Sequence, residues 1–134
     1  TIQLKGILNG LVAAKEVKRE IKKTLELNPR HVGALSASAS YYSQVPGILG
    51  GSIEKAEQQA LEAIKIEPRY TFLYLDAARI YIKMEKYDLA REYLAKMKAI
   101  KNPYSRADYE VVDLPIGEKL RKQINELTKT VDKE

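Results

Sequence analysis

The sequence predicts an all-α fold built as a row of antiparallel helix hairpins, with a capping helix at the C-terminal end. Three stretches of the chain end alike, at Pro29, Pro68 and Pro103, so the prolines are 39 and then 35 residues apart. Repeated helix hairpins have a period of about 34 residues, and a proline ends a helix because it cannot donate the next backbone hydrogen bond. The long stretches show helical periodicity, and none alternates with period two as a strand would.

The helices predicted before each proline have apolar residues at intervals of three and four, which places them on one face. Residues 32–44 and 71–83 predict two further helices, because they are rich in alanine, leucine and tyrosine and contain no proline. Each of these two pairs with the helix that follows it. The predicted apolar faces comprise Val17, Ile21 and Leu25; Ala56, Ala60, Ala63 and Ile64; and Ala90, Leu94 and Met97.

The last pair has the most regular pattern of aromatic and small residues. The residues that carry it are Tyr74, Ala77, Ala78 and Tyr81, then Tyr87, Ala90, Leu94 and Met97, with Leu35, Ala39 and Tyr42 at matching places in the preceding pair. Alanines let two helix axes approach closely, and tyrosines fill the space between hairpins. Over residues 12–103 this pattern resembles the tetratricopeptide repeat (TPR). The resemblance implies a TPR-like α-solenoid.

The whole chain, residues 1–134, is predicted to form a single TPR-like domain. Residues 1–29 are interpreted as a partial first repeat, in which residues 1–11 are the tail of an incomplete first helix. Residues 30–68 form the second repeat, with a loop insertion at 45–52, and residues 69–103 form the third. Residues 104–134 are a linker and the capping helix, whose Leu120, Ile124 and Leu127 are expected to be buried.

The insertion at 45–52 has a composition that breaks a helix. It contains Pro46, Gly47, Gly50 and Gly51, and Ser52 is suited to cap the helix that follows. Together with Tyr41-Tyr42 before it and Lys55-Ala56 after it, the motif resembles a narrower group of divergent repeat proteins. This group includes the T component of bacterial TRAP transporters and the regulators of microtubule dynamics. The transporter role of the group implies an extracytoplasmic protein that works beside a substrate-binding partner.

Catalytic chemistry is not expected, because no set of nucleophile and base can be assembled. The only histidine, His31, follows Pro29 and is interpreted as a polar residue that opens the next helix. The chain has no cysteine and no carboxylate cluster at ligand spacing, so neither a metal site nor a cofactor is predicted. The glycine-rich loop lacks the lysine of a phosphate loop and is interpreted as a turn. The protein is therefore predicted not to be an enzyme.

The net charge of +5 gives a modest preference for acidic partners. Its strongest concentration is a basic stripe on one helix, formed by Lys15, Lys18, Arg19, Lys22 and Lys23. The stripe is either a solvated face or a surface for an anionic partner. Nucleic acid is disfavoured because no aromatic residues interleave with the charges. No run is long and apolar enough to span a membrane. The expected location is extracytoplasmic in a bacterium if a signal was removed, and cytoplasmic otherwise.

An inner groove lined by the first helix of each pair is where such arrays bind their partners. Asp76 and Arg79 either pair with each other along the helix or contact a ligand. Phe72, the only phenylalanine, is either an interface anchor or packs on the turn at 68–70. Gly33 and Ala37 are on the same face. The predicted binding residues are Ser36, Ser40, Gln44, Phe72, Leu75, Asp76, Arg79 and Lys83, extended by Pro46, Gly47, Gly50 and Gly51.

Two interpretations of function remain open from the sequence. The first is a non-catalytic binding module or scaffold that holds a protein or peptide partner in the inner groove. The second is an extracytoplasmic ligand-binding or accessory component of a solute transporter, as the resemblance to the T component implies. A small apolar ligand and homo-oligomer formation are compatible with either interpretation.

Overall fold

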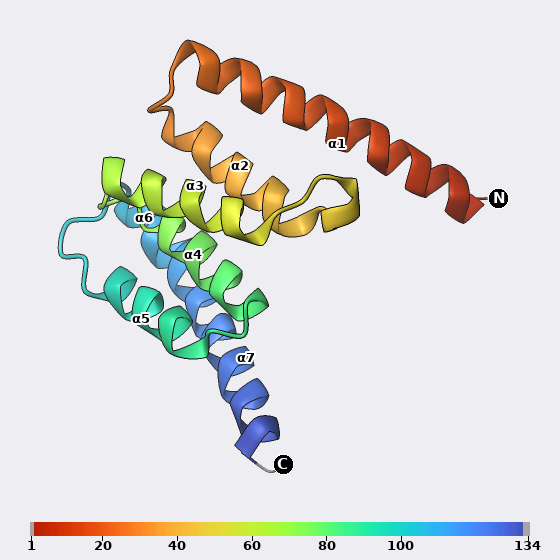
Figure 1. The fold of residues 1–134 in the computed structure, drawn as a ribbon. Helices are drawn as coiled ribbons and strands as arrows, with labels where there is room; N and C mark the ends of the chain where they lie inside the picture. The colour runs from red at the N-terminus through yellow and green to blue at the C-terminus, as the bar shows by residue number, and fades with distance from the viewer. Residues whose placement is uncertain (1, 133–134) are drawn as a thin grey trace.

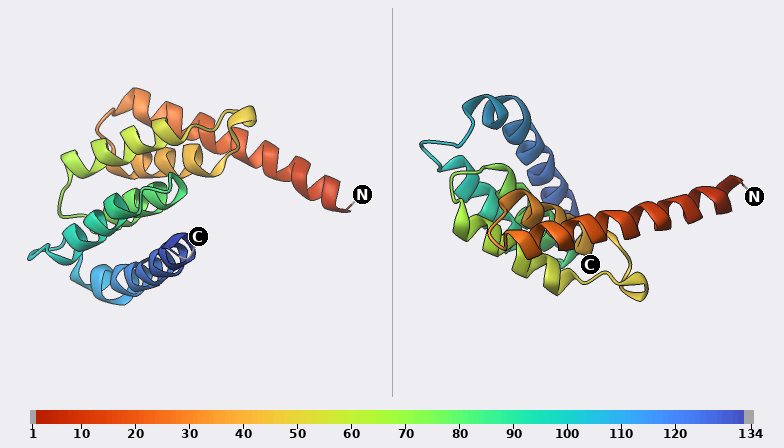
Figure 2. Two further views of the ribbon diagram at one scale, coloured as in Figure 1. Left: turned by 60° about the horizontal axis from the view of Figure 1, so that its bottom comes forward. Right: turned by 90° about the horizontal axis from the view of Figure 1, so that it is seen from above.

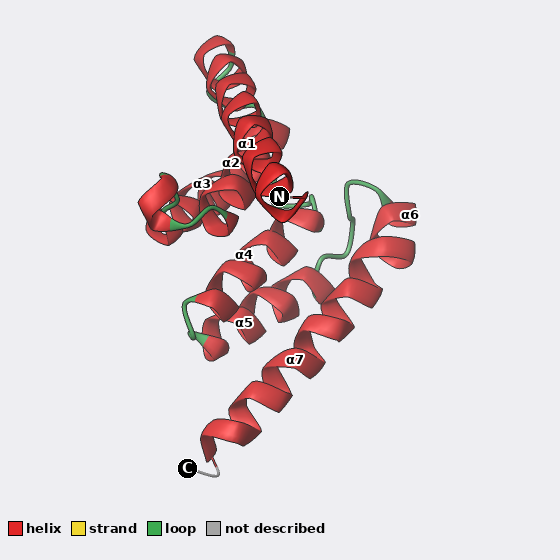
Figure 3. Ribbon diagram, turned by 90° about the vertical axis from the view of Figure 1, so that its right-hand side faces the viewer, coloured by secondary structure: helices red, strands yellow, loops and turns green. Residues whose placement is uncertain are grey.

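The computed structural model describes residues 2 to 132, and this part of the chain is all-α, as predicted. No strand occurs among these residues, and short loops join the helices (Figure 3). The elements in chain order are α1 (Ile2–Leu27), α2 (Val32–Gln44), the 3-10 turn η1 (Gly47–Leu49), α3 (Ile53–Ile66), α4 (Phe72–Lys83), α5 (Tyr87–Lys98), the short α6 (Arg106–Asp108), the π-helical turn η2 (Tyr109–Asp113) and α7 (Leu114–Asp132).

The helices pack as two antiparallel hairpins with a further helix on each side. The hairpins are α2–α3 and α4–α5, and α4 contacts both helices of the preceding hairpin (Figure 1). The helix α7 packs across α4 and α5, and α1 packs on α2. The first helices of the two hairpins, α2 and α4, are therefore neighbours.

Two helix starts are fixed by the residues that the sequence indicates. The Nδ1 atom of His31 accepts a hydrogen bond from the backbone amide of Ala34 at 2.9 Å, so His31 caps α2. The Oγ atom of Ser52 accepts from the backbone amide of Lys55 at 3.2 Å and caps α3. Both side chains satisfy backbone donors that the helix itself leaves unpaired.

The insertion loop depends on its last two glycines. Gly50 has a φ of 103°, a conformation that other residues rarely adopt. At Gly51 an added Cβ would lie 1.6 Å from the carbonyl oxygen of Val45, so only glycine fits there. The backbone amide of Ser52 then donates to the carbonyl of Tyr42 at 2.9 Å. The loop therefore closes directly onto the last turn of α2.

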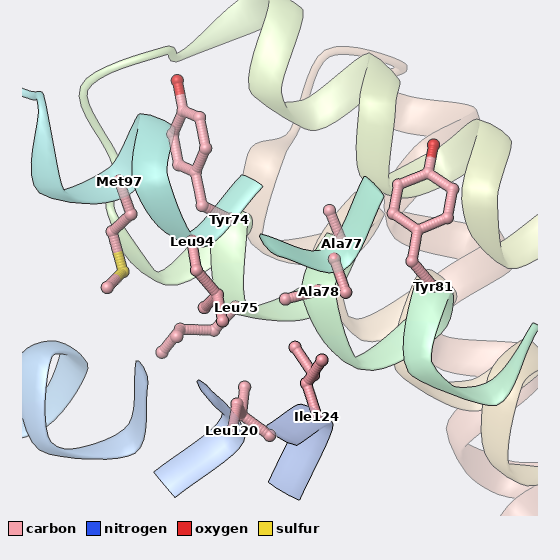
Figure 4. Packing of buried hydrophobic residues seen from close by; sticks show 10 residues of the cluster. Tyr74, Leu75, Ala77, Ala78, Tyr81, Leu94, Met97, Leu120 and Ile124 are labelled. Carbon is pink, nitrogen blue, oxygen red and sulfur yellow. The ribbon is translucent and has the colours of Figure 1, made fainter. Parts of the chain in front are cut away.

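The main core lies between the second hairpin and α7. Leu75 of α4 has no exposed surface and extends toward Leu120 of α7, with Leu94 beside it (Figure 4). The approach of α7 is close because position 117 is glycine, where an added Cβ would lie 2.9 Å from the Cε atom of Met97. A second cluster joins the hairpins through small residues, namely Ala39, Ala56 and Ala60 with Ile80.

The ends of the chain differ from the predicted repeat pattern. Residues 2–27 form one continuous helix rather than a helix tail followed by a second helix. Only its C-terminal part packs on α2, so the rest extends beyond the other helices (Figure 2). Its apolar side is exposed there, with Leu4 60%, Ile7 62%, Leu8 53% and Val12 61% exposed.

Two residues that were predicted to be buried are exposed. Val17, expected on the apolar face of the first repeat, is 48% exposed because the contact between α1 and α2 involves later turns of α1. Leu127 is 36% exposed, whereas Leu120 and Ile124 of α7 are buried as expected. Among residues 2–132, none of the helices combines the length and the apolar character needed to cross a membrane.

Candidate functional site

The predicted groove residues of α2 and α4 do lie side by side. The hydroxyl of Ser36 donates a hydrogen bond to the Oδ2 atom of Asp76 at 2.6 Å, and the ammonium of Lys83 donates to the carbonyl of Ser43 at 2.6 Å. The first contact joins the two helices near their middle, and the second joins them at their C-terminal ends. Between them is a hollow of about 100 Å³, lined by Ser40, Ser43, Gln44, Asp76, Arg79 and Ile80. We call this surface the α2–α4 groove.

Asp76 is held at the base of the groove rather than in an ion pair. It is only 8% exposed, and Ser36 is its hydrogen-bond partner. Burial raises the pKa of Asp76 to about 6, and the negative charge of Asp113 adds to the rise. The hydrogen bond from Ser36 and the positive charge of Arg79 act in the opposite direction and lower it. Arg79 is exposed and forms no ion pair within the described residues. Its guanidinium can therefore contact a ligand.

The raised pKa of Asp76 predicts that stability changes with pH. A carboxyl group with a higher pKa in the folded than in the unfolded state stabilises the fold below pH about 4, and this contribution is lost as the pH rises to about 6. We expect the free energy of unfolding of the wild type to fall by roughly 2 kcal/mol over this window relative to Asp76→Asn, which cannot titrate. Urea denaturation at pH 4, 5, 6 and 7 measures the difference, and parallel curves for the two proteins would contradict it.

Leu75 was predicted to line the groove, and this prediction is wrong. Its side chain has no exposed surface because α7 covers that side of α4. Phe72 is not in the groove either. It lies in the first turn of α4, with its ring centroid 6.4 Å from that of Tyr70 in an edge-to-face arrangement. Packing on the 68–70 turn, the alternative considered for Phe72, is therefore the one that the structure shows.

The glycine-rich loop is separate from the groove hollow. Pro46, Gly47 and Gly50 are exposed, and Gly51 is partly buried beneath Val45. None of the four predicted loop residues lines the hollow between α2 and α4. Instead, the nearest side-chain atom to an added Cβ at Gly50 is the ammonium of Lys18, 4.0 Å away on α1. The loop residues therefore lie outside the groove hollow, and Gly50 lies close to α1.

A larger hollow lies between α1, α2 and α3, outside the residues that the sequence predicts to bind a partner. Its volume is about 490 Å³. Two of its lining residues are in contact, since the ammonium of Lys55 lies 4.5 Å from the ring centroid of Tyr42. Two members of the basic stripe, Lys18 and Lys22, line it, whereas Arg19 points to Glu16 at 3.4 Å. The lining residues are Lys18, Ile21, Lys22, Leu25, Glu26, Ser38, Tyr41, Tyr42, Lys55 and Gln59. We call this hollow the lysine cleft.

A third hollow, of about 170 Å³, is formed where the start of α4 meets the segment before α7. Phe72 lines it together with Tyr70 and Tyr104. The sequence carries a signal that could have indicated this site, because each tyrosine follows a repeat-ending proline, Pro68 or Pro103, by one or two residues. The remaining lining residues are Thr71, Ser105, Asp108, Val112 and Asp113. We call this hollow the aromatic pocket.

His31 is engaged in capping α2, and no group of three or more metal-ligating side chains is close enough to hold an ion within the described part of the chain. Comparison with models of known protein families and with curated proteins gives no match.

Proposed function

We propose that this protein is a TPR-like repeat protein that holds a protein or peptide partner on the α2–α4 groove, without catalysis. The repeat assignment is supported by the matching places of Ala39 in α2 and Ala78 in α4, both of which have no exposed surface. In a TPR-like array, small residues at these places let the helices approach closely, and the first helices line the binding face.

The observation that carries the proposal is the contrast between the two sides of the groove. On the α2 side, Gly33, Ser36 and Ala37 are small and at least partly exposed, so a partner backbone can approach closely there. On α4 the exposed residues Arg79 and Lys83 carry positive charge. Lys83 uses one donor on Ser43, and an ammonium has three. The groove therefore suits an extended segment with a carboxylate.

The size of the groove favours a macromolecular partner over a small solute. Pockets for small molecules usually measure about 300–1,000 Å³, whereas the groove hollow measures about 100 Å³. A hollow of this size accommodates one side chain, so most of the contact area must come from the flat surfaces on either side.

Peptides selected from a random display library on the immobilised chain should be enriched in acidic residues. We expect the double variant Arg79→Ala with Lys83→Ala to bind them about tenfold or more weakly, because charged contacts of this kind contribute roughly 1–3 kcal/mol. Fluorescence anisotropy with labelled peptides measures the affinities.

The matched control removes two exposed lysines from other faces, Lys65→Ala and Lys119→Ala, and should leave the affinities unchanged. Phe72→Ala should also have no effect, because Phe72 lines a different hollow. If the control variant lost as much affinity as the groove variant, the loss would be due to the change in net charge alone. That result would contradict the groove as the binding site.

The second candidate, an extracytoplasmic accessory component of a solute transporter, is favoured by the lysine cleft. Its volume of about 490 Å³ lies in the range of small-molecule sites, and Lys18, Lys22 and Lys55 would complement an anionic solute. The display selection separates the two candidates, since a solute-binding protein would return no peptides that depend on Arg79 and Lys83. A signal peptide or lipoprotein motif encoded at the start of the gene would favour the transport role.

A further inference from the structure

The aromatic pocket presents three rings that are fixed relative to one another. The rings of Tyr70 and Tyr104 are stacked, with centroids 5.6 Å apart and planes at 27°, and Phe72 meets Tyr70 edge-on at 79°. Tyr70 is 37% and Tyr104 63% exposed, so two of the rings reach the surface. Exposed aromatic side chains that gather around a hollow are typical of sites that bind a partner.

Contacts between distant parts of the chain hold this arrangement in place. The loop that joins α5 to α6 is drawn green in Figure 3, and in it the backbone amide of Tyr104 donates to the carbonyl of Arg69 at 2.8 Å. The hydroxyl of Thr71 donates to the carboxylate of Asp113, and both residues are buried. The pocket is therefore formed before a ligand arrives, and little ordering has to accompany binding.

The charges at the pocket are negative. Asp108 is exposed, lines the hollow and forms no ion pair within the described residues. The two arginines that are nearest in sequence to the pocket residues form ion pairs with other side chains. Arg69 pairs with Glu67 at 3.7 Å, and Arg106 pairs with Glu110 at 3.4 Å. Asp113 adds a second carboxylate, and burial together with the charge of Asp108 raises the pKa of Asp113. A positively charged ligand group would complement these carboxylates.

We propose that the aromatic pocket binds the guanidinium group of an arginine side chain from a partner protein. Ring faces attract cations, and a planar guanidinium can stack on a tyrosine while it donates hydrogen bonds to a carboxylate such as Asp108. A hollow of about 170 Å³ is too small for most complete ligands and suits a single side chain. The site differs from the α2–α4 groove in position and in the sign of its charge, so it does not depend on the function proposed above.

The proposal is tested by titrating the full chain with small blocked amino acids and following backbone amide shifts by NMR. The probes are N-acetyl-arginine methylamide, the citrulline analogue, which has a similar shape but no charge, and the lysine analogue. We expect saturable shifts centred on Tyr70, Tyr104 and Asp108. The arginine probe should bind about two- to fivefold more tightly than the citrulline probe and more tightly than the lysine probe.

Variants at the pocket distinguish binding from a purely structural role of the rings. Tyr104→Ala and Asp108→Asn should each weaken the arginine probe about two- to fivefold, whereas Tyr104→Phe keeps the ring and retains binding. The control is Asp88→Asn, which removes an exposed carboxylate on α5. Circular dichroism checks that each variant is folded. Equal binding of arginine and citrulline, equal binding of arginine and lysine, or unchanged binding in Asp108→Asn would overturn the proposal.

Discussion

Replacing Leu75 with alanine is expected to lower the free energy of unfolding by about 2–5 kcal/mol, the range for removing a large aliphatic side chain from a closed core. Leu75 has no exposed surface and is enclosed by α4, α5 and α7, where Leu94 and Ile124 contact the same cluster. The loss combines the burial of the side chain that is removed with the cavity that it leaves between the helices. Urea denaturation monitored by circular dichroism measures the change.

Arg79→Ala is the matched control, because Arg79 lies one turn further along α4 and is exposed. Its effect on the free energy of unfolding should stay within about 0.5 kcal/mol. If Leu75→Ala were equally mild, Leu75 would have to face solvent, and α7 could not cover α4 as it does in this structure.

Ala78→Leu and Ala39→Leu should each lower the free energy of unfolding by about 1–3 kcal/mol, because a larger side chain overpacks a closed core. Both alanines have no exposed surface, and each lies where two helices approach closely. The far-ultraviolet spectrum should remain helical, since the substitution disturbs packing and leaves helix propensity nearly unchanged. Thermal and urea denaturation measure the loss.

The chain provides the same substitution at an exposed place as a control. Ala37 lies on α2 two residues before Ala39 and is exposed, so Ala37→Leu should leave stability within about 0.5 kcal/mol of the wild type. If both Ala39→Leu and Ala78→Leu were as stable as the wild type, the alignment of the two hairpins would be contradicted. The repeat assignment depends on that alignment.

The helices could be predicted well because their signals are local. Residues 32–44 were predicted as a helix, and α2 has the same bounds. Pro29 and Pro68 each lie two residues after the last residue of α1 or α3, and the caps at His31 and Ser52 likewise act within a few residues of their own position. The third proline is a weaker signal, because α5 ends at Lys98, five residues before Pro103. The alanines at 56, 60 and 90 were placed on apolar faces by their spacing, and those at 39 and 78 by the repeat pattern, and all five are buried.

The candidate site was predicted less well because exposure depends on distant contacts. The repeat pattern assigned Leu75 to the groove, but whether that face of α4 is open depends on α7, about 40 residues later in the chain. Val17 and Leu127 have the correct spacing for an apolar face, yet spacing does not indicate how far a neighbouring helix extends. The lysine cleft and the aromatic pocket each combine segments that are far apart in sequence, so periodicity along one helix could not reveal them.

The projecting part of α1 has a consequence for hydrogen exchange. Its backbone hydrogen bonds lack tertiary contacts to reinforce them, and Gly6 and Gly10 each disfavour helix by about 1 kcal/mol relative to alanine. Short helices without packing are marginal in water. Amide protons near Gly6 and Gly10 therefore exchange through local opening, at rates that do not depend on the global free energy of unfolding, whereas amides near Leu75 require the core to open. Any molecule that covers the apolar side of this segment would slow exchange there first.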